Sequence, residues 1–249
     1  MMKTLLQIEG IDASYGKRQI LHKISMNLSR GEKVILIGPN GAGKTTLLKT
    51  VIGLLSPGNG SINYLGEDIT GASVRTRVKK GISYLLQTEN IVPGLTVEEN
   101  LALGGYFLSK QELEKQKNMV LDAMEFLRPK LKTRAGLMSG GERQGLALSM
   151  VLMRNPKVLL LDEPSAGLAP KAAKEIIERL DNIQASFQVE MVCMVEHNLK
   201  LALKWATKII LLVQGHVVLV SDSPKDFVQK PEELVQKPEE LEKYFFEQV

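Results

Sequence analysis

Cysteine is nearly missing from this sequence: Cys193 is the only one among 249 residues. A disulfide within the chain is therefore excluded, and the apolar neighbours of Cys193 predict that it lies on a buried strand. Apolar runs of about 18 residues are missing as well, so we expect no transmembrane helix. Gln7 and Glu9 interrupt the apolar stretch near the N-terminus too early for a signal peptide. Any role at a membrane must then come through a partner.

Charge of one sign is not gathered into blocks. The 32 Lys and Arg residues exceed the 28 Asp and Glu residues, which gives a formal net charge of +4 and a pI of about 9.0. This balance suits a polyanionic ligand, but the charges are spread along the chain, and we expect no nucleic-acid partner. The length and a hydrophobic content of 44% allow one large α/β domain with a sizeable core.

Short apolar runs alternate with helical patterns. Strands are expected at 5–16, 18–29, 33–38, 60–69, 81–87, 157–163 and 189–196, and a closing hairpin at 207–222. Helical periodicity covers 45–55, much of 88–155, and 171–184. The pattern predicts a single α/β domain whose core is formed by 1–87 and 156–222, with 88–155 inserted as a helical subdomain. The tail, 223–249, repeats the heptad VQKPEEL at 228–234 and 235–241, which predicts one or two short surface helices.

The stretch GPNGAGKTT at 38–46 matches G-x-x-x-x-G-K-[ST] between an expected strand and an expected helix. Its glycines let the backbone curl until its N–H groups surround phosphates. Lys44 supplies positive charge to the β and γ phosphates, and the Thr45 hydroxyl can bind Mg²⁺. We expect the whole loop to bind a nucleotide: Gly38, Pro39, Asn40, Gly41, Ala42, Gly43, Lys44, Thr45 and Thr46.

Two adjacent carboxylates, Asp162 and Glu163, end the apolar run VLLLD. Open α/β sheets bind ligands at the carboxyl ends of their strands, so both are candidates for the nucleotide site. Asp162 is placed to hold the Mg²⁺ shell, and Glu163 to polarise an attacking water. The alternative for Glu163 is an ordinary exposed acid at a helix start.

These ordered motifs resemble the ATP-binding subunits of ABC transporters, from Tyr15 to about Pro224. SGGE at 139–142 is similar to the signature motif of that family. The resemblance implies a P-loop NTPase core with a mixed sheet, in which a RecA-like parallel core joins an antiparallel β subdomain, and an inserted helical subdomain. It also implies that two such domains bind head to tail, so that Ser139, Gly140 and Gly141 of one contact the ATP held by the other.

The resemblance assigns three more residues. Tyr15 corresponds to the aromatic residue that stacks on adenine, although a turn tyrosine packed on the sheet is the alternative. Gln87 corresponds to the glutamine that contacts Mg²⁺ or the attacking water, and His197 to the histidine that contacts the γ-phosphate. The expected cofactors are ATP and Mg²⁺, the expected metal ligands are Thr45, Gln87 and Asp162, and the expected catalytic residues are Glu163, His197 and Gln87.

Departures from the family pattern occur at Met138, Glu142 and Ala169, where leucine, glutamine and often aspartate are usual. The aspartate of other members crosses the dimer interface, so communication between the two ATP sites is expected to differ in this chain. The stretches SAGLAP, VPGLTVEENL and IGPNGAGKTTLL resemble the ATPase subunits of branched-chain amino-acid uptake systems.

The expected function is therefore that of an ATPase, peripheral to the cytoplasmic face of the cell membrane, that powers a permease. We expect a homo- or heterodimer of ATPase subunits, contact with integral permease subunits, and an indirect link to a periplasmic or extracellular solute-binding protein. The permease-docking surface is expected at 88–133, with Ile91, Val92 and Leu95 exposed in a Pro-Gly loop. Alternatives are a soluble or exporter-associated ABC ATPase, serving lipid or polysaccharide export or cofactor assembly, a non-hydrolysing scaffold, and, last, a P-loop kinase.

Overall fold

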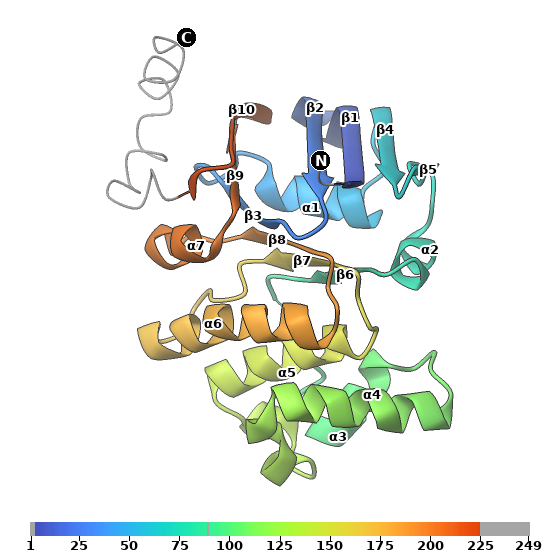
Figure 1. Cartoon of the computed structure of the whole chain (residues 1–249), viewed down its shortest axis with the longest axis vertical. Coiled ribbons are helices and arrows are strands. Elements are labelled where there is room, and N and C mark those ends of the chain that lie inside the picture. The colour runs from blue at the N-terminus through green and yellow to red at the C-terminus, as the bar shows by residue number, and fades with distance from the viewer. Residues whose placement is uncertain (1–2, 89, 225–249) are drawn as a thin grey trace.

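The computed structural model describes residues 3–88 and 90–224, and its fold is the predicted one (Figure 1). Four strands form an antiparallel sheet in the order β2-β1-β4-β5: β1 (Thr4–Tyr15), β2 (Arg18–Ser29), β4 (Asn59–Tyr64) and β5 (Glu67–Asp68). The stretch at 60–69 was predicted as a turn and one strand with a polar end, but it forms a hairpin of two strands. Leu65 and Gly66 turn the chain there with φ of 55° and 84°.

A second sheet has six strands in the order β10-β9-β3-β8-β7-β6. Its bounds are β3 (Lys33–Ile37), β6 (Ile82–Leu85), β7 (Val158–Asp162), β8 (Met191–Val195), β9 (Lys208–Val213) and β10 (His216–Ser221). All neighbours are parallel except β9 and β10, which form the predicted closing hairpin. The parallel strands are almost continuously apolar because both of their faces are covered. Cys193 is buried on β8, as predicted.

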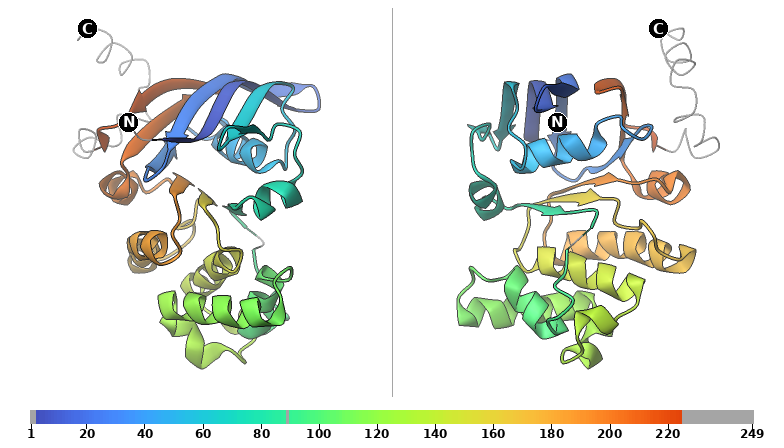
Figure 2. Two further views of the ribbon diagram at one scale, coloured as in Figure 1. Left: turned by 45° about the vertical axis from the view of Figure 1, so that its right-hand side comes forward. Right: turned by 180° about the vertical axis from the view of Figure 1, so that it is seen from behind.

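The helices are α1 (Lys44–Ile52), α2 (Val74–Lys79), α3 (Val97–Gly104), α4 (Lys110–Ala123), α5 (Gly140–Leu152), α6 (Pro170–Ser186) and α7 (Leu199–Trp205), with two 3₁₀ segments, η1 (Glu125–Lys130) and η2 (Ala135–Leu137). Helix α1 and the four-stranded sheet lie on one face of the six-stranded sheet, and α5 and α6 lie on the other (Figures 1 and 2). No helix of the described ranges is both long and apolar enough to cross a bilayer.

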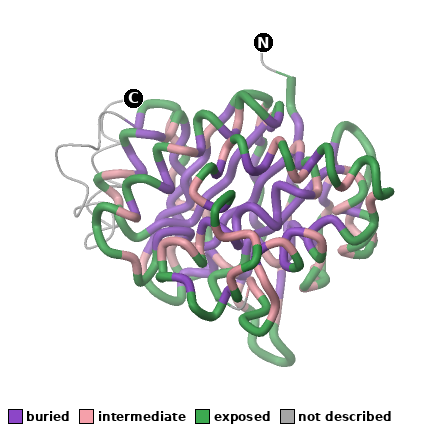
Figure 3. Tube along the Cα trace, turned by 90° about the horizontal axis from the view of Figure 1, so that it is seen from below, coloured by how far each residue is buried: buried purple, intermediate pink, exposed green. Residues whose placement is uncertain are grey.

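Strand residues alternate between two hydrophobic cores. On β3, Val34 and Leu36 pack with α1 and the four-stranded sheet, whereas Ile35 and Ile37 pack with the helices on the other face. Buried residues accordingly run through the middle of the molecule in Figure 3. The same alternation puts Asp162 on the α1 side of β7, because Leu160, two residues earlier, belongs to the core on that side.

Three of the helices between residues 88 and 155 begin with a capping box. Thr96, Ser109 and Ser139 each accept from the backbone of a glutamate three residues later, and that glutamate accepts in return. In the loop before α3, Val92 is 40% exposed, but Ile91 packs against the larger core and Leu95 is half-buried. The predicted exposure of Ile91 and Leu95 was therefore wrong, because the core extends beneath this loop. The heptad repeat at 228–241 lies outside the described residues.

Candidate functional site

The loop between β3 and α1 has a backbone that two of its glycines make possible. Gly38 has a φ of 144°, and a Cβ there would lie 2.0 Å from the carbonyl oxygen of Leu212. Gly43 has a φ of 102° and forms the N-cap of α1, where a Cβ would lie 2.7 Å from a methyl carbon of Leu21. The helix has neither a side-chain cap nor an acidic residue in its first turn. Its N-terminal N–H groups thus suit an anion.

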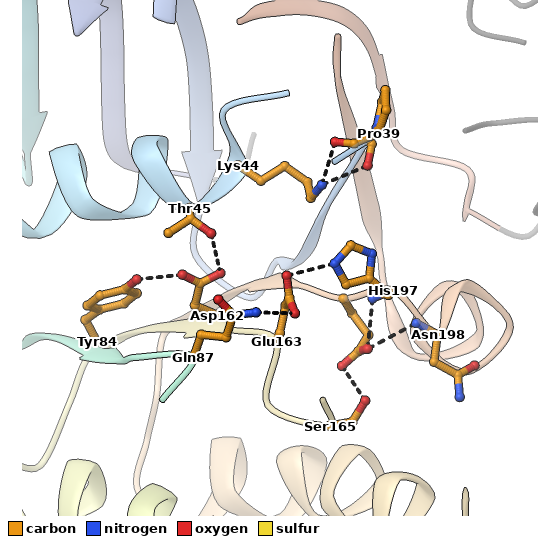
Figure 4. Close-up of polar contacts among 12 residues, drawn as sticks. Pro39, Lys44, Thr45, Tyr84, Gln87, Asp162, Glu163, Ser165, His197 and Asn198 are labelled. Carbon is orange, nitrogen blue, oxygen red and sulfur yellow. Dashed lines mark hydrogen bonds and ion pairs between the residues drawn. The ribbon is translucent and has the colours of Figure 1, made fainter. Parts of the chain in front are cut away.

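Lys44 lies over this loop. Its Nζ donates hydrogen bonds to the carbonyl oxygens of Gly38, at 2.8 Å, and Pro39, at 3.0 Å (Figure 4). Burial lowers the pKa of Lys44, while the carboxylates of Glu163 and Asp162 oppose that shift. The lysine charge is thus held between the loop backbone and the two predicted carboxylates.

Asp162 joins the loop to the sheet. Its Oδ1 accepts from the Thr45 hydroxyl at 3.0 Å, and its Oδ2 accepts from the Tyr84 hydroxyl at 2.7 Å (Figure 4). Burial raises the pKa of Asp162, and the two donors oppose that rise. A hydroxyl and a carboxylate are oxygen ligands of the kind that Mg²⁺ prefers, so this pair fits the predicted metal. Sequence reasoning missed Tyr84; its position on the strand ending before Gln87 was the available signal.

Two side chains that follow other strands lie within hydrogen-bond distance of the Glu163 carboxylate. Gln87 Nε2 donates to Glu163 Oε2 at 2.7 Å, and His197 Nε2 lies 2.7 Å from Glu163 Oε1 (Figure 4). The Glu163 backbone has a φ of 52°, in the left-handed region, and its N–H donates to the carbonyl of Val195. The predicted catalytic residues Gln87 and His197, which follow β6 and β8, therefore meet at the carboxylate of Glu163, which follows β7.

Tyr15 and the signature residues lie apart from this cluster. Tyr15 ends β1 and is 47% exposed. Ser139 caps α5, and its partner Glu142 also pairs with Lys130. In the described part of the chain, no hydrogen bond joins residues 139–141 to residues 38–46, and α1 and α5 lie on opposite faces of the sheet (Figure 2). The remaining loop residues are in place: Ala42 and Thr46 are buried, and Asn40 and Gly41 are exposed.

A phosphate-binding loop, an adjacent carboxylate pair and converging glutamine and histidine side chains define a P-loop nucleotide hydrolase. The family model described as ABC transporter matches residues 21–166. The branched-chain amino acid transport ATP-binding protein BraG of Pseudomonas aeruginosa is 41% identical over 86% of this chain and 91% of its own length. The probable branched-chain amino acid transport ATP-binding protein LivF of Archaeoglobus fulgidus is 38% identical, over 86% and 90%.

A solved dimeric ATP-binding cassette in a post-hydrolysis state, bound to ADP and phosphate, is 25% identical, with a TM-score of 0.77 over 88% of this chain and 98% of that one. The chain belongs to the ABC transporter family. It is an ATP-hydrolysing subunit of that family.

Proposed function

We propose that Glu163 polarises the water that attacks the γ-phosphate of ATP, with Gln87 and His197 fixing the carboxylate. One observation carries this proposal: Gln87 and His197, which follow separate strands, both lie within hydrogen-bond distance of the Glu163 carboxylate. A general base must lie within such reach of its proton, and positioned neighbours keep it there. His197 remains half exposed, so it can also contact a phosphate.

The loop from Gly38 to Thr46 holds the phosphates, and Lys44 exchanges its two carbonyl partners for β and γ phosphate oxygens. Thr45, Asp162 and Gln87 would hold Mg²⁺, which would neutralise charge on the phosphates. Among the described residues, no group of three or more His, Cys, Asp or Glu could hold a metal by itself. A magnesium held by these three side chains would complete its coordination with nucleotide oxygens and water. Tyr15, exposed at the end of β1, stacks on adenine.

ATP is hydrolysed at the interface of a head-to-tail dimer, where Ser139, Gly140 and Gly141 complete the site of the partner subunit. Two observations support this arrangement. The start of α5 makes no hydrogen bond to the loop of its own chain within the described residues. The similar cassette bound to ADP and phosphate is dimeric. Backbone N–H groups at a helix start stabilise phosphate charge only within hydrogen-bond reach.

The subunit works at the cytoplasmic face of the membrane and powers uptake of branched-chain or related amino acids, as the names of BraG and LivF suggest. Residues 88–155 form a helical subdomain that docks on the permease. Exposed apolar side chains gather along this stretch, at Val92, Leu103, Tyr106 and Phe107. A protein surface with such a set suits a protein partner.

Two variants test the hydrolysis site. Glu163→Gln keeps the shape of the side chain but removes the base, so we expect ATP binding to persist and turnover to fall to background. Lys44→Ala should instead weaken ATP binding, measured by titration with a fluorescent analogue. Wild-type turnover in Glu163→Gln would exclude Glu163 as the base, and unchanged affinity in Lys44→Ala would exclude the role of the lysine.

A mixing experiment tests the composite site. Ser139→Arg spoils the signature but leaves the loop intact, and Lys44→Ala does the reverse. Mixed, the two inactive chains should form heterodimers with one complete site and recover part of the ATPase activity. Heterodimers that form with ATP yet stay inactive, together with a strongly weakened ATP affinity of the Ser139→Arg monomer, would refute the assignment.

Docking and solute are tested in cells. Tyr106→Glu should reduce copurification with the permease and uptake of labelled leucine, while the purified subunit keeps its basal ATPase activity. Lys115→Glu, on α4, is a control that changes charge on the same subdomain. Normal leucine, isoleucine and valine uptake by cells lacking this subunit would exclude branched-chain amino acids as its solutes.

A further inference from the structure

Glu196 is a buried carboxylate that has no cationic partner among residues 3–88 and 90–224. It follows β8 directly, is 3% exposed, and forms no ion pair with any residue that the structure describes. A buried charge of this kind is costly unless hydrogen bonds compensate it. Glu196 has three such donors, and all come from segments that border the hydrolysis site.

Two of the donors belong to the backbone that carries the histidine. Glu196 Oε1 accepts from the N–H of His197 at 2.8 Å and from the N–H of Asn198 at 3.0 Å. Asn198 is in turn the N-cap of α7. The carboxylate thus fixes the chain on both sides of the His197 side chain.

The third donor comes from the segment after Glu163. The hydroxyl of Ser165, itself buried, donates to Glu196 Oε2 at 2.8 Å (Figure 4). The N–H of Ala166 donates to the carbonyl of Glu163, so Ser165 lies in a turn that begins at the base. Because His197 also contacts Glu163, these contacts close a ring from Glu163 through Ser165, Glu196 and His197 back to Glu163.

We propose that Ser165 and Glu196 are positioning residues for ATP hydrolysis, because their hydrogen bond holds the backbone of His197 where its ring meets Glu163. This inference rests on the proposed roles of Glu163 and His197. The Ser165–Glu196 hydrogen bond closes the ring of contacts, and this closed ring restricts His197 more than the covalent backbone alone does. Opening it should leave nucleotide binding intact, because neither residue forms a hydrogen bond with the loop at 38–46 within the described structure.

Matched pairs of variants separate the hydrogen bond from packing. Ser165→Ala removes the hydroxyl, and Ser165→Thr keeps it. Glu196→Ala removes all three acceptor contacts, whereas the amide of Glu196→Gln can accept from both N–H groups and donate to Ser165. We expect kcat to fall about tenfold in Ser165→Ala and in Glu196→Ala, with KM and the Kd of a fluorescent ATP analogue unchanged. Ser165→Thr and Glu196→Gln should restore most of kcat.

A spectroscopic measurement follows the histidine without turnover. The sequence has three histidines, so the ring C–H NMR signal of His197 can be assigned by replacing it, and those of His22 and His216 serve as internal references. In Ser165→Ala we expect the His197 signal to shift while the two references stay in place. The double variant Ser165→Ala/Glu196→Ala tests whether the two residues act as one unit. If they do, its loss of kcat should be no greater than that of Glu196→Ala alone.

Three outcomes would overturn the proposal: wild-type kcat in Ser165→Ala, equal losses in Ser165→Ala and Ser165→Thr, or an unmoved His197 signal. Glu163→Gln, measured alongside, distinguishes this failure from failure of the proposed function. If Glu163→Gln is inactive and Ser165→Ala is normal, only the positioning role is wrong. If Glu163→Gln hydrolyses ATP at the normal rate, the assignment of Glu163 as the base is wrong. The NMR signal alone then decides whether the contacts of Ser165 and Glu196 hold His197 in place.

Discussion

Tyr84→Phe removes one hydrogen bond from the carboxylate proposed to bind magnesium. Tyr84 is 7% exposed, and its hydroxyl lies 2.7 Å from Oδ2 of the fully buried Asp162. Hydrogen bonds to charged groups contribute about 1.5–3 kcal/mol, and the free energy of unfolding should fall by about that amount. Burial raises the pKa of Asp162 and the Tyr84 hydrogen bond opposes that rise, so its loss would raise the pKa further, and the carboxylate would lose its orientation. Partners that orient a metal ligand typically change metal affinity by about 10- to 100-fold.

The assay is a Mg²⁺ titration of ATP turnover at saturating ATP, with Mn²⁺ binding followed by electron paramagnetic resonance as a readout free of turnover. We expect both half-saturation concentrations to rise at least about tenfold in Tyr84→Phe. Urea unfolding measures the loss of stability.

Tyr64→Phe is the matched control. Tyr64 is 3% exposed on β4, and its hydroxyl has no hydrogen-bond partner among the described residues. Its removal should leave metal affinity unchanged and stability equal or higher, because no partner loses its bond. Equal effects of Tyr84→Phe and Tyr64→Phe, or a wild-type Mg²⁺ dependence in Tyr84→Phe, would refute the reasoning.

Three further predictions concern the cores. Burial raises the pKa of Cys193 from 9.0, its value in the unfolded chain, to about 12. The stability that this thiol contributes is fully present below pH 9.0 and is lost as the pH rises towards 12. Relative to Cys193→Ala, the free energy of unfolding should fall by up to about 1.4 kcal/mol per pH unit in that window. Gly145→Ala puts a Cβ 2.4 Å from the Phe126 ring and should cost about 1–3 kcal/mol in urea unfolding, with recovery when Phe126→Leu is added. Arg77 donates to four backbone carbonyls, and Arg77→Lys should lower the thermal midpoint, since one ammonium cannot reach all four.

Features written in local sequence were predictable. The motif at 38–46 and the carboxylates that end the run VLLLD are recognisable from short stretches of neighbouring residues. Helices α2 and α7, of six and seven residues, were missed because so few turns show no clear period.

Features set by strand order were not predictable from spacing. Strand β6 pairs with β7 in a register that places Tyr84 opposite Leu160. The side chains of Tyr84 and Asp162 therefore both point to the α1 side of the sheet, where the tyrosine reaches the carboxylate. In the sequence, Glu196 is only the last residue of an expected apolar strand. Its hydrogen bond with Ser165 becomes visible only when the fold places the segment after Glu163 beside it. The prediction for Ile91 was wrong for the same reason, because Ile91 packs against core residues that lie far from it in sequence. Contacts between segments far apart in sequence carried the missing information.

The left-handed backbone of Glu163 sets stability against activity at this position. A non-glycine residue there costs of order 1 kcal/mol, which glycine or asparagine would largely avoid. Glycine or asparagine would, however, lose the hydrogen bonds that Gln87 and His197 make with the Glu163 carboxylate, and such a variant would lack the proposed base. Any gain in stability at this position would therefore come with a loss of ATP hydrolysis. An engineer who stabilises this protein should hold residue 163 fixed and seek the gain elsewhere.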